Sequence, residues 1–284
     1  MWIDPRHRIL ETLATSRGLR VRRLGREDAA AEQLAAGAGA HGVYVQNALA
    51  AGGADGLVFE VDGEPAAAAW FGVRGNLVIV SAGAIEAHEA EVAAQVVRSR
   101  WSWRIALGDA AVVDSIREQV ARSTLAHRDQ VYYVGDQADA PATMVRDDVR
   151  APERGDRARL ARATLALNAS DLNIAPERVD RRWLYNTIDE RTREGSTRVL
   201  GPVGELWTKL DFGSEGPAGV VVEGVFTFPE VRGRGLGAEL VASCMARCEA
   251  QTSLHVSEHN AAARRCYERA GMREAGRCRL LLLG

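Results

Sequence analysis

The stretch that decides the fold is Val220-Val-Val-Glu-Gly-Val-Phe-Thr-Phe-Pro-Glu-Val-Arg-Gly-Arg-Gly-Leu-Gly-Ala-Glu-Leu-Val241. Its first part is rich in valine and phenylalanine and predicts a strand over 219–228, which the next residue, a proline, ends. Three glycines at alternate positions follow, and then an apolar pattern with the period of a helix. The stretch therefore predicts a strand, a glycine-rich loop and a helix in direct succession.

The glycine-rich loop predicts an anion-binding site. Gly233, Gly235 and Gly237 let successive backbone N–H groups converge on a ligand, because no Cβ stands in the way. The helix that follows adds the partial positive charge of its N-terminus. Arg232 and Arg234 raise the local positive potential further. A phosphate or pyrophosphate is therefore the ligand that we expect here.

Two other phosphate-binding loops fit this stretch less well. A P-loop needs Gly-Lys-Ser/Thr at the helix start, whereas Gly237-Ala-Glu239 supplies neither the lysine nor the hydroxyl. Gly233-x-Gly235-x-x-Ala238 fits the looser dinucleotide fingerprint, but only 46 residues follow Ala238, too few for the rest of a Rossmann domain. An ordinary glycine-rich turn with solvated arginines stays open as the structural alternative.

A second motif lies downstream of the loop. The sequence Asn260-Ala-Ala-Ala-Arg-Arg-Cys-Tyr267-Glu-Arg-Ala-Gly271-Met has an asparagine followed seven residues later by a tyrosine, and then a Glu-x-x-Gly turn. Together with Arg232-Gly-Arg-Gly-Leu-Gly-Ala238, which resembles an R/Q-x-x-G-x-G/A signature, it resembles the GNAT superfamily of acetyl-CoA-dependent N-acetyltransferases. The two motifs lie in the family's order, and the resemblance covers about residues 146–284.

The resemblance implies a cosubstrate, acetyl-CoA, and an acceptor, a primary amine of a small molecule or a peptide. In the family, the strand before the loop pairs through its backbone with the pantetheine arm, and the loop and helix start hold the pyrophosphate. The asparagine caps the next helix and also meets the cofactor, with a pure cap as the alternative. The implied cofactor-binding residues are Val225, Phe226, Thr227, Arg232, Gly233, Arg234, Gly235, Leu236, Gly237, Ala238 and Asn260.

Tyr267 occupies the position at which the family places its general acid. A phenol with an unperturbed pKa of about 10 stays protonated at neutral pH and can donate a proton to the departing thiolate. A tyrosine packed on a helix face is the alternative interpretation of Tyr267.

Glu223 and His255 are the candidates for the general base. Glu223 lies in the middle of an apolar strand, where a carboxylate facing a cleft can relay a proton through water, and a partner arginine is the alternative. His255 lies where some family members hold their base, and an imidazole with a pKa of about 6.5 suits the task. A half-buried structural histidine is the alternative for His255. We rank Glu223 ahead of His255.

Domain organisation follows from length and from one polar stretch. The chain has 284 residues, the length of two ordinary domains. Residues 135–152 are polar and proline-marked, so we place the boundary at 142, giving a first domain over 1–142 and a second over 143–284. Each half shows two helices, a meander of strands, and then helix and strand again.

The first half also resembles a diverged N-terminal domain found in a bacterial subgroup of GNAT proteins. The residues that carry this resemblance are Arg20-Val-Arg-Arg-Leu-Gly25 and Gly75-Asn-Leu-Val-Ile-Val80. No glycine-rich cradle accompanies them. We therefore expect an α/β (mixed α+β) fold with tandem GNAT-like domains, each a mostly antiparallel twisted sheet flanked by helices.

Composition limits the partners and the compartment. With 46% apolar and 26% charged residues and a net charge of −2, the chain resembles an average soluble protein and has no field that would gather nucleic acid. No apolar run approaches the ~20 residues that span a membrane, and the start, Met1 to Leu10, is charged. We expect a cytoplasmic protein with neither nucleic acid nor membrane as partner.

The four cysteines predict no metal site. Cys244, Cys248, His255 and His259 give C-x3-C-x6-H-x3-H, whose central spacing is far shorter than the ~12 residues of a zinc finger. Small buried side chains in a reducing cytoplasm are the simpler interpretation.

These observations predict an acetyl-CoA-dependent N-acyltransferase whose site lies in the second half. An acetyl-CoA-binding or amine-binding sensor with little catalysis is the alternative. A pure interaction domain would require the glycine loop to be accidental.

Overall fold

The computed structural model describes residues 18–284, which divide into two compact units. The first unit comprises residues up to Gln130 together with Arg277–Gly284, and the second is Val131–Gly276. The division at 142/143 does not follow these bounds, and it stays a prediction about independently folding domains. The charged start, Met1 to Leu10, lies outside the described residues. In the described part of the chain, no helix has the length and apolar character needed to cross a membrane.

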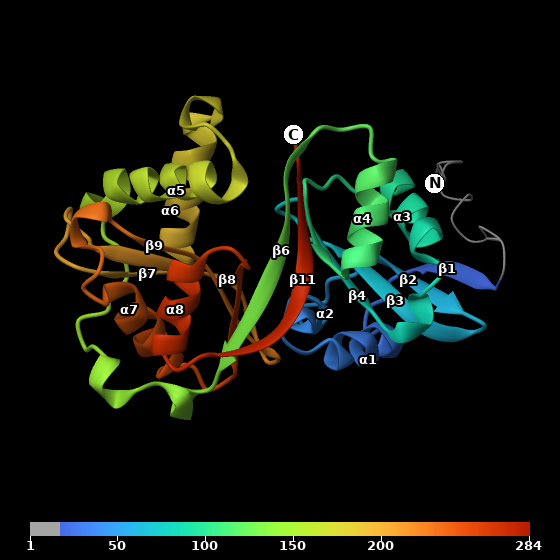
Figure 1. The fold of residues 1–284 in the computed structure, drawn as a ribbon, viewed down its shortest axis with the longest axis horizontal. Coiled ribbons are helices and arrows are strands. Elements are labelled where there is room, and N and C mark those ends of the chain that lie inside the picture. Colours follow the sequence, from blue (N-terminus) through green and yellow to red (C-terminus); the bar gives the residue numbers. More distant parts are fainter. Residues whose placement is uncertain (1–17) are drawn as a thin grey trace, which may run out of the picture. The chain divides into compact units, whose positions relative to one another are not determined.

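The first unit is a mostly antiparallel sheet with helices on both faces. Its strands are ordered β1-β2-β3-β4-β5-β11-β6. The neighbours β4 and β5 pair in parallel, whereas β1–β2, β2–β3, β3–β4 and β5–β11 pair antiparallel. The helices α3 and α4 lie on one face and α1 and α2 on the other (Figure 1). The elements are β1 (Leu19–Arg23), α1 (Ala29–Gly37), α2 (Val43–Ala50), β2 (Gly56–Val61), β3 (Glu64–Phe71), β4 (Asn76–Ser81), α3 (Glu89–Arg98), β5 (Ile105–Gly108), α4 (Ala110–Gln119), and parts of β6 (Thr124–Gly135) and β11 (Arg273–Leu283).

The expected meander is confirmed by the pairing of β2 with β3 and of β3 with β4. Its first turn is Asp62-Gly63, whose φ angles of 53° and 90° suit a tight hairpin in which glycine meets no steric cost. Phe59, Leu77 and Ile79 from these strands are fully buried in the core of the unit. The middle of each of these strands is buried on both faces, because helices cover both sides of the sheet.

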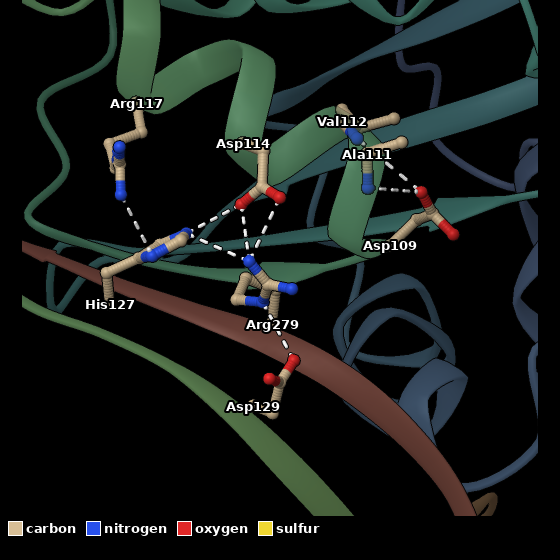
Figure 2. Close-up of polar contacts among 8 residues, drawn as sticks. All are labelled: Asp109, Ala111, Val112, Asp114, Arg117, His127, Asp129 and Arg279. Carbon is tan, nitrogen blue, oxygen red and sulfur yellow. Dashed lines mark hydrogen bonds and ion pairs between the residues drawn. The ribbon is translucent and has the colours of Figure 1, made fainter.

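The last strand of the chain, β11, completes the first unit. Its residues Arg279–Leu282 pair antiparallel with Ile105–Gly108 of β5, and Leu281 and Leu283 belong to the core of this unit. Figure 2 shows how polar contacts fix this strand: Arg279 Nη1 lies 2.7 Å from Asp114 Oδ1, and its Nε donates to Asp129 Oδ1 at 3.0 Å.

His127 joins the same cluster. Its Nε2 lies 2.6 Å from Asp114 Oδ1 and its Nδ1 lies 3.1 Å from Arg117 Nη1 (Figure 2). Asp109 beside it caps α4 by accepting from the backbone N–H of Ala111 at 2.9 Å. The end of β11 is thus held by side chains of α4 and β6.

The second unit has the strand order β11-β6-β10-β9-β8-β7, with two helix layers. Adjacent residues Val199 and Leu200 belong to separate apolar clusters, one under α5 and α6 and one under α7 and α8, so the helices cover both faces. The elements are α5 (Arg157–Leu172), α6 (Arg181–Glu194), β7 (Thr197–Leu200), β8 (Thr208–Gly216), β9 (Gly219–Thr227), α7 (Leu236–Met245), β10 (Thr252–Ser257) and α8 (Ala261–Arg269).

The mixed α/β class, with a mostly antiparallel sheet flanked by helices, is confirmed. Two local expectations were too long. The periodic pattern of the sequence predicts one helix over 235–251 and another over 109–124. The first ends at Met245, and the second ends at Gln119, where β6 follows after a short loop.

Candidate functional site

The strands β9 and β10 are paired only where they begin. The parallel ladder between them holds Thr252↔Val220 and Ser253↔Val221, and in the described residues it goes no further. Val222–Thr227 of β9 and Leu254–Ser257 of β10 continue beyond it. Two diverging parallel strands leave backbone N–H and C=O groups without a strand partner, and such groups seek other hydrogen bonds. The end of β9 is therefore an open backbone edge.

A bulge in β9 accompanies this divergence. On β8, Asp211 faces Glu223 and Lys209 faces Phe226, so two residues of β9, Gly224 and Val225, oppose one of β8. Gly224 has φ 58°, and a Cβ there would lie 2.9 Å from both Asp211 Oδ2 and Lys209 Nζ. The bulge therefore requires glycine at position 224.

The glycine loop follows β9 directly. Gly233 and Gly235 have φ 78° and 84°, the left-handed region that favours glycine. A Cβ at Gly233 would meet nothing within 4 Å, whereas one at Gly237 would lie 3.1 Å from Thr227 Oγ1 and 3.2 Å from Cys266 Sγ. The first two glycines thus shape the loop, and Gly237 permits close packing of α7.

In the part of the chain that the structure describes, no side chain caps the N-terminus of α7. Its N-cap residue is Gly235, so the first backbone N–H groups of the helix have no side-chain acceptor from the cap. Gly237 and Ala238, in the first turn, are buried, while Arg232, Gly233 and Arg234 are exposed. The N–H groups and the positive end of the helix dipole are suited to a phosphate.

Three arginines surround the loop, and one of them was not foreseen from the sequence. Arg232 donates from Nε to the carbonyl of Thr227 at 3.0 Å, and Arg234 lies over the ring of Trp207. Arg269, from the end of α8, places Nη2 3.3 Å from the position that a Cβ of Gly235 would take. The second motif supplies Arg269 two residues after its tyrosine, but nothing in the spacing indicates that it faces the loop.

The asparagine of the second motif caps a helix, as predicted from the sequence. Asn260 is the N-cap of α8, and its Oδ1 accepts from the backbone N–H of Ala263 at 3.1 Å. Its expected contact with a cofactor stays a prediction.

Tyr267 lies buried in the same helix, with 7% of its surface exposed. Its ring packs against that of Tyr133, with 5.9 Å between the centroids. Among the described residues, no hydrogen bond involves the Tyr267 hydroxyl. Desolvation raises the pKa of this phenol well above its usual range, and neighbouring Cys266 and Asp171 act in the same direction. Tyr267 therefore keeps its proton throughout the neutral and mildly alkaline range.

Glu223 forms an ion pair with an arginine, which is the alternative to a general base given for it above. Arg191 of α6 donates from Nη2 to Glu223 Oε1 at 2.6 Å, and its Nη1 lies 2.6 Å from Asp211 Oδ2. Lys209, the only lysine of the chain, binds Asp211 as well. Glu223 thus belongs to a cluster of two cations and two carboxylates.

His255 lies on β10 and is half-buried, with its ring edge-on to Tyr132 at 5.7 Å between centroids. Desolvation lowers the pKa of His255, and the charge of Glu223 opposes that shift. His255 is therefore uncharged at neutral pH. The two candidates for the general base, Glu223 and His255, lie on the neighbouring strands β9 and β10. The charge of Glu223 influences the pKa of His255.

Three residues of this cluster were not predicted from the sequence: Arg191, Lys209 and Asp211. A signal was present for two of them, because Lys209 and Asp211 alternate with the apolar residues Leu210 and Phe212 in a predicted strand. Arg191 gave no signal, since five arginines lie between positions 178 and 193. For metals, residues 18–284 contain no group of three or more His, Cys, Asp or Glu side chains placed to hold an ion, and the four cysteines are free.

Part of the second unit matches a known protein family. Residues 194–272 match the family model described as Acetyltransferase (GNAT) family. No curated protein matches the chain. A solved GCN5-related N-acetyltransferase from Sphaerobacter thermophilus is similar at 18% identity, covering 93% of this chain and 94% of that one, with a TM-score of 0.54.

Two further solved structures are similar over the same span. One is a Drosophila protein with 14% identity, coverage of 93% and 98%, and a TM-score of 0.59. The other is a tandem GNAT protein from the clavulanic acid biosynthesis pathway, with 15% identity, coverage of 93% and 97%, and a TM-score of 0.45. At these identities the Sphaerobacter and Drosophila structures show the fold alone, and they show it across both units.

Proposed function

We propose that this protein transfers an acetyl group from acetyl-CoA to a primary amine, and the match of residues 194–272 to the acetyltransferase (GNAT) family model supports this proposal. The observation that carries the proposal is the open backbone edge of β9, which leads directly into a glycine loop and an uncapped helix N-terminus. The open backbone edge can form hydrogen bonds with the amides of an extended arm. The glycine loop and the helix N-terminus can bind a pyrophosphate at the end of that arm. The proposed site lies within the second unit.

The residues of the loop fit the pyrophosphate of such a cofactor. The first-turn N–H groups from Leu236 onward have no side-chain cap, and the space beside Gly233 is open. Arg232, Arg234 and Arg269 add positive charge around the loop, and the described residues place no carboxylate in an ion pair with any of them. Val225, Phe226 and Thr227 offer their backbone groups to the amides of the arm. When bound, the cofactor supplies the thioester whose acetyl group is transferred.

Direct transfer to an amine requires that the amine lose a proton. We assign this task to His255, which reverses the ranking made from the sequence. An uncharged imidazole can accept a proton, and the lowered pKa of His255 keeps it uncharged at neutral pH. Glu223 is a poorer acceptor, because one of its carboxylate oxygens is already held by Arg191.

The departing thiolate needs a proton in return, and Tyr267 is the group that we assign to supply it. Its raised pKa keeps the phenol protonated, and its hydroxyl is not engaged by another described side chain. Tyr267 also lies on α8, which packs against the glycine loop through Cys266. The position of the proposed acid is therefore fixed relative to the proposed cofactor-binding loop.

Calorimetric titration of acetyl-CoA into the wild-type protein and the Gly235→Glu variant tests this proposal. The added side chain and charge oppose the pyrophosphate, so we expect micromolar binding by the wild type and none by the variant. Gly276→Glu is the matched control, because a Cβ at Gly276 meets nothing within 4 Å. It should bind like the wild type.

Two outcomes would contradict the proposal. Absence of binding by the wild type up to about a millimolar would exclude acetyl-CoA as the cofactor. Binding without acetylation of any member of a panel of small amines, polyamines and peptides would favour the sensor alternative over the enzyme.

A further inference from the structure

Lys209 is an exception to the composition of the chain. The sequence contains 36 lysine and arginine residues, and Lys209 is the only lysine among them. It lies on β8 and is almost fully buried, with 3% of its surface exposed. Burial of an ammonium is costly, and a compact ammonium with rotatable donors differs from the planar fork of an arginine. A sequence that uses arginine everywhere else therefore retains an ammonium at one buried position.

The ammonium of Lys209 has more hydrogen-bond donors than its protein neighbours use. Among the described residues, the one acceptor for its Nζ is Asp211 Oδ2. The same oxygen atom lies 2.6 Å from Nη1 of Arg191, and Asp211 Oδ1 accepts from Thr197 Oγ1 at 2.7 Å. Two of the three N–H groups of this ammonium thus stay available to another oxygen atom, and buried donors are normally paired.

The Nζ of Lys209 lies next to the bulge of β9. A Cβ at Gly224 would lie 2.9 Å from this nitrogen atom and 2.9 Å from Asp211 Oδ2, so a side chain at position 224 would cover the ammonium. Glu223, Gly224 and Val225 are partly exposed. A ligand that reaches the bulge therefore approaches a buried positive charge that is screened by no side chain of residue 224.

The proposed binding mode directs the acetyl end of the cofactor toward this bulge. The glycine loop, which follows Thr227, holds the pyrophosphate, and the pantetheine arm runs back along the open edge of β9. Gly224 lies three residues before Thr227, which is roughly 10 Å along a strand. An extended arm that starts at the loop therefore carries its thioester toward Gly224.

We propose that Lys209 is a further catalytic residue, whose ammonium donates a hydrogen bond to the carbonyl oxygen of the acetyl group at the bulge. This inference rests on the proposed function. As the amine nitrogen bonds to the carbonyl carbon, an electron pair moves to the oxygen atom, and it returns when the C–S bond breaks. The amine proton goes to His255 and the thiolate receives the proton of Tyr267. Lys209 keeps its own proton and stabilises the negative charge that develops on the oxygen atom.

The test is NMR spectroscopy of the full-length protein made with lysine that is ¹⁵N-labelled at Nζ. Because the chain has one lysine, the ammonium signal needs no assignment. The protein is saturated with CoA, with acetyl-CoA, or with ethyl-CoA, a thioether that has CH₂ in place of the carbonyl group. We expect acetyl-CoA to move the signal and ethyl-CoA to leave it at the position found with CoA. Signals that coincide for acetyl-CoA and ethyl-CoA would overturn the proposal.

Calorimetry separates failure of this inference from failure of the proposed function. If acetyl-CoA binds and the signal of Lys209 stays where ethyl-CoA leaves it, the role of Lys209 is wrong and the proposed function stands. If acetyl-CoA does not bind up to about a millimolar, both are wrong.

Replacement of Lys209 gives a kinetic readout. Lys209→Met removes the donors at a similar side-chain length, and kcat should fall roughly 100-fold, because loss of one such donor costs on the order of 10²–10³-fold. The calorimetric Kd for CoA, which has no acetyl group, should stay unchanged. Thr197→Val is the matched control, because it removes another buried partner of Asp211 and leaves the ammonium in place.

The control variant should keep the wild-type kcat. An equal loss of kcat in Lys209→Met and Thr197→Val would show that the buried cluster is needed as a whole, and would overturn the specific role of the ammonium. The NMR comparison uses the wild-type protein, so it decides the question even where Lys209→Met does not fold.

Discussion

At the scale of single residues, the buried phenol of Tyr267 gives the sharpest prediction. Tyr267→Phe should lower kcat about 100-fold, because general acid catalysis contributes on the order of 10²–10⁴-fold. The calorimetric Kd for acetyl-CoA should not change, since the hydroxyl makes no contact within the glycine loop. The thermal midpoint should stay near that of the wild type, because the lost hydroxyl has no hydrogen-bonding partner in the protein.

Tyr133→Phe is the matched control for this experiment. Its ring neighbours that of Tyr267, but its hydroxyl donates to Glu268 Oε1 at 2.9 Å and accepts from Arg264 Nε at 3.1 Å. Its loss should cost about 1 kcal/mol of stability and leave kcat intact. If Tyr267→Phe kept the full kcat, Tyr267 would be a tyrosine that packs on a helix face and takes no part in proton transfer.

Residues of the site differ in how far the sequence reveals them. The helix cap at Asn260 was predicted and is confirmed, because capping depends on the backbone only three residues away. The partner of Glu223 was left open, since Arg191 is 32 residues distant and is chosen by the packing of α6 against the sheet. The position of Tyr267 followed from a motif, whereas its packing against the ring of Tyr133 from β6 has no local signal in the sequence.

At the scale of secondary-structure elements, the bulge of β9 depends on one glycine. Gly224→Ala should destabilise the protein by about 1–3 kcal/mol, because a side chain is strained at φ 58° and its Cβ would press on the buried Asp211–Lys209 pair. Urea denaturation measures the difference. Gly276→Ala, on β11, has open space around its Cβ and should change stability little.

The same variant should weaken acetyl-CoA binding, because flattening the bulge would favour continued pairing of β9 with its neighbour and close the open backbone edge. Equal stability of the Gly224→Ala and Gly276→Ala proteins would show that the bulge accepts alanine at position 224 without strain.

Helices and strands could be predicted where a local sequence pattern determines them. The strands of the first meander follow from short apolar runs separated by turn residues such as Asp62-Gly63, and the helix α7 follows from its apolar pattern. The strand β6 was missed, because His127, Arg128 and Asp129 interrupt its apolar residues, and its pairing comes from distant strands. The divergence of β9 from β10 has no local signal either, since the bulge that accompanies it is visible only in the pairing of β9 with β8.

At the scale of the whole molecule, the order of elements occurs twice, but each unit is completed by chain from beyond the expected boundary. The first unit takes Leu281 and Leu283 of the C-terminal strand into its core, and the second takes Val131 and Tyr133 of β6. A boundary drawn from composition falls in the polar stretch after β6. Nothing in that stretch indicates that the strand before it belongs to the later unit.

Fragments of the second unit test this arrangement. Residues 131–276 and residues 143–276 differ only by the end of β6 and the segment that follows it. Val131 and Tyr133 are almost fully buried, and burial of each such side chain contributes ~1.5–3 kcal/mol. The segment also packs closely elsewhere, because a Cβ at Gly271 would collide with the backbone of Asp139.

We therefore expect residues 131–276 to unfold cooperatively in urea and residues 143–276 to show no cooperative transition. The lost burial is comparable to the ~5–15 kcal/mol that stabilises an ordinary domain, and without β6 one edge of β10 has no neighbour. Circular dichroism and intrinsic fluorescence of Trp183 and Trp207 follow both fragments in the same way. Cooperative unfolding of the shorter fragment at the same urea concentration would instead support independent folding of the domain that begins at residue 143.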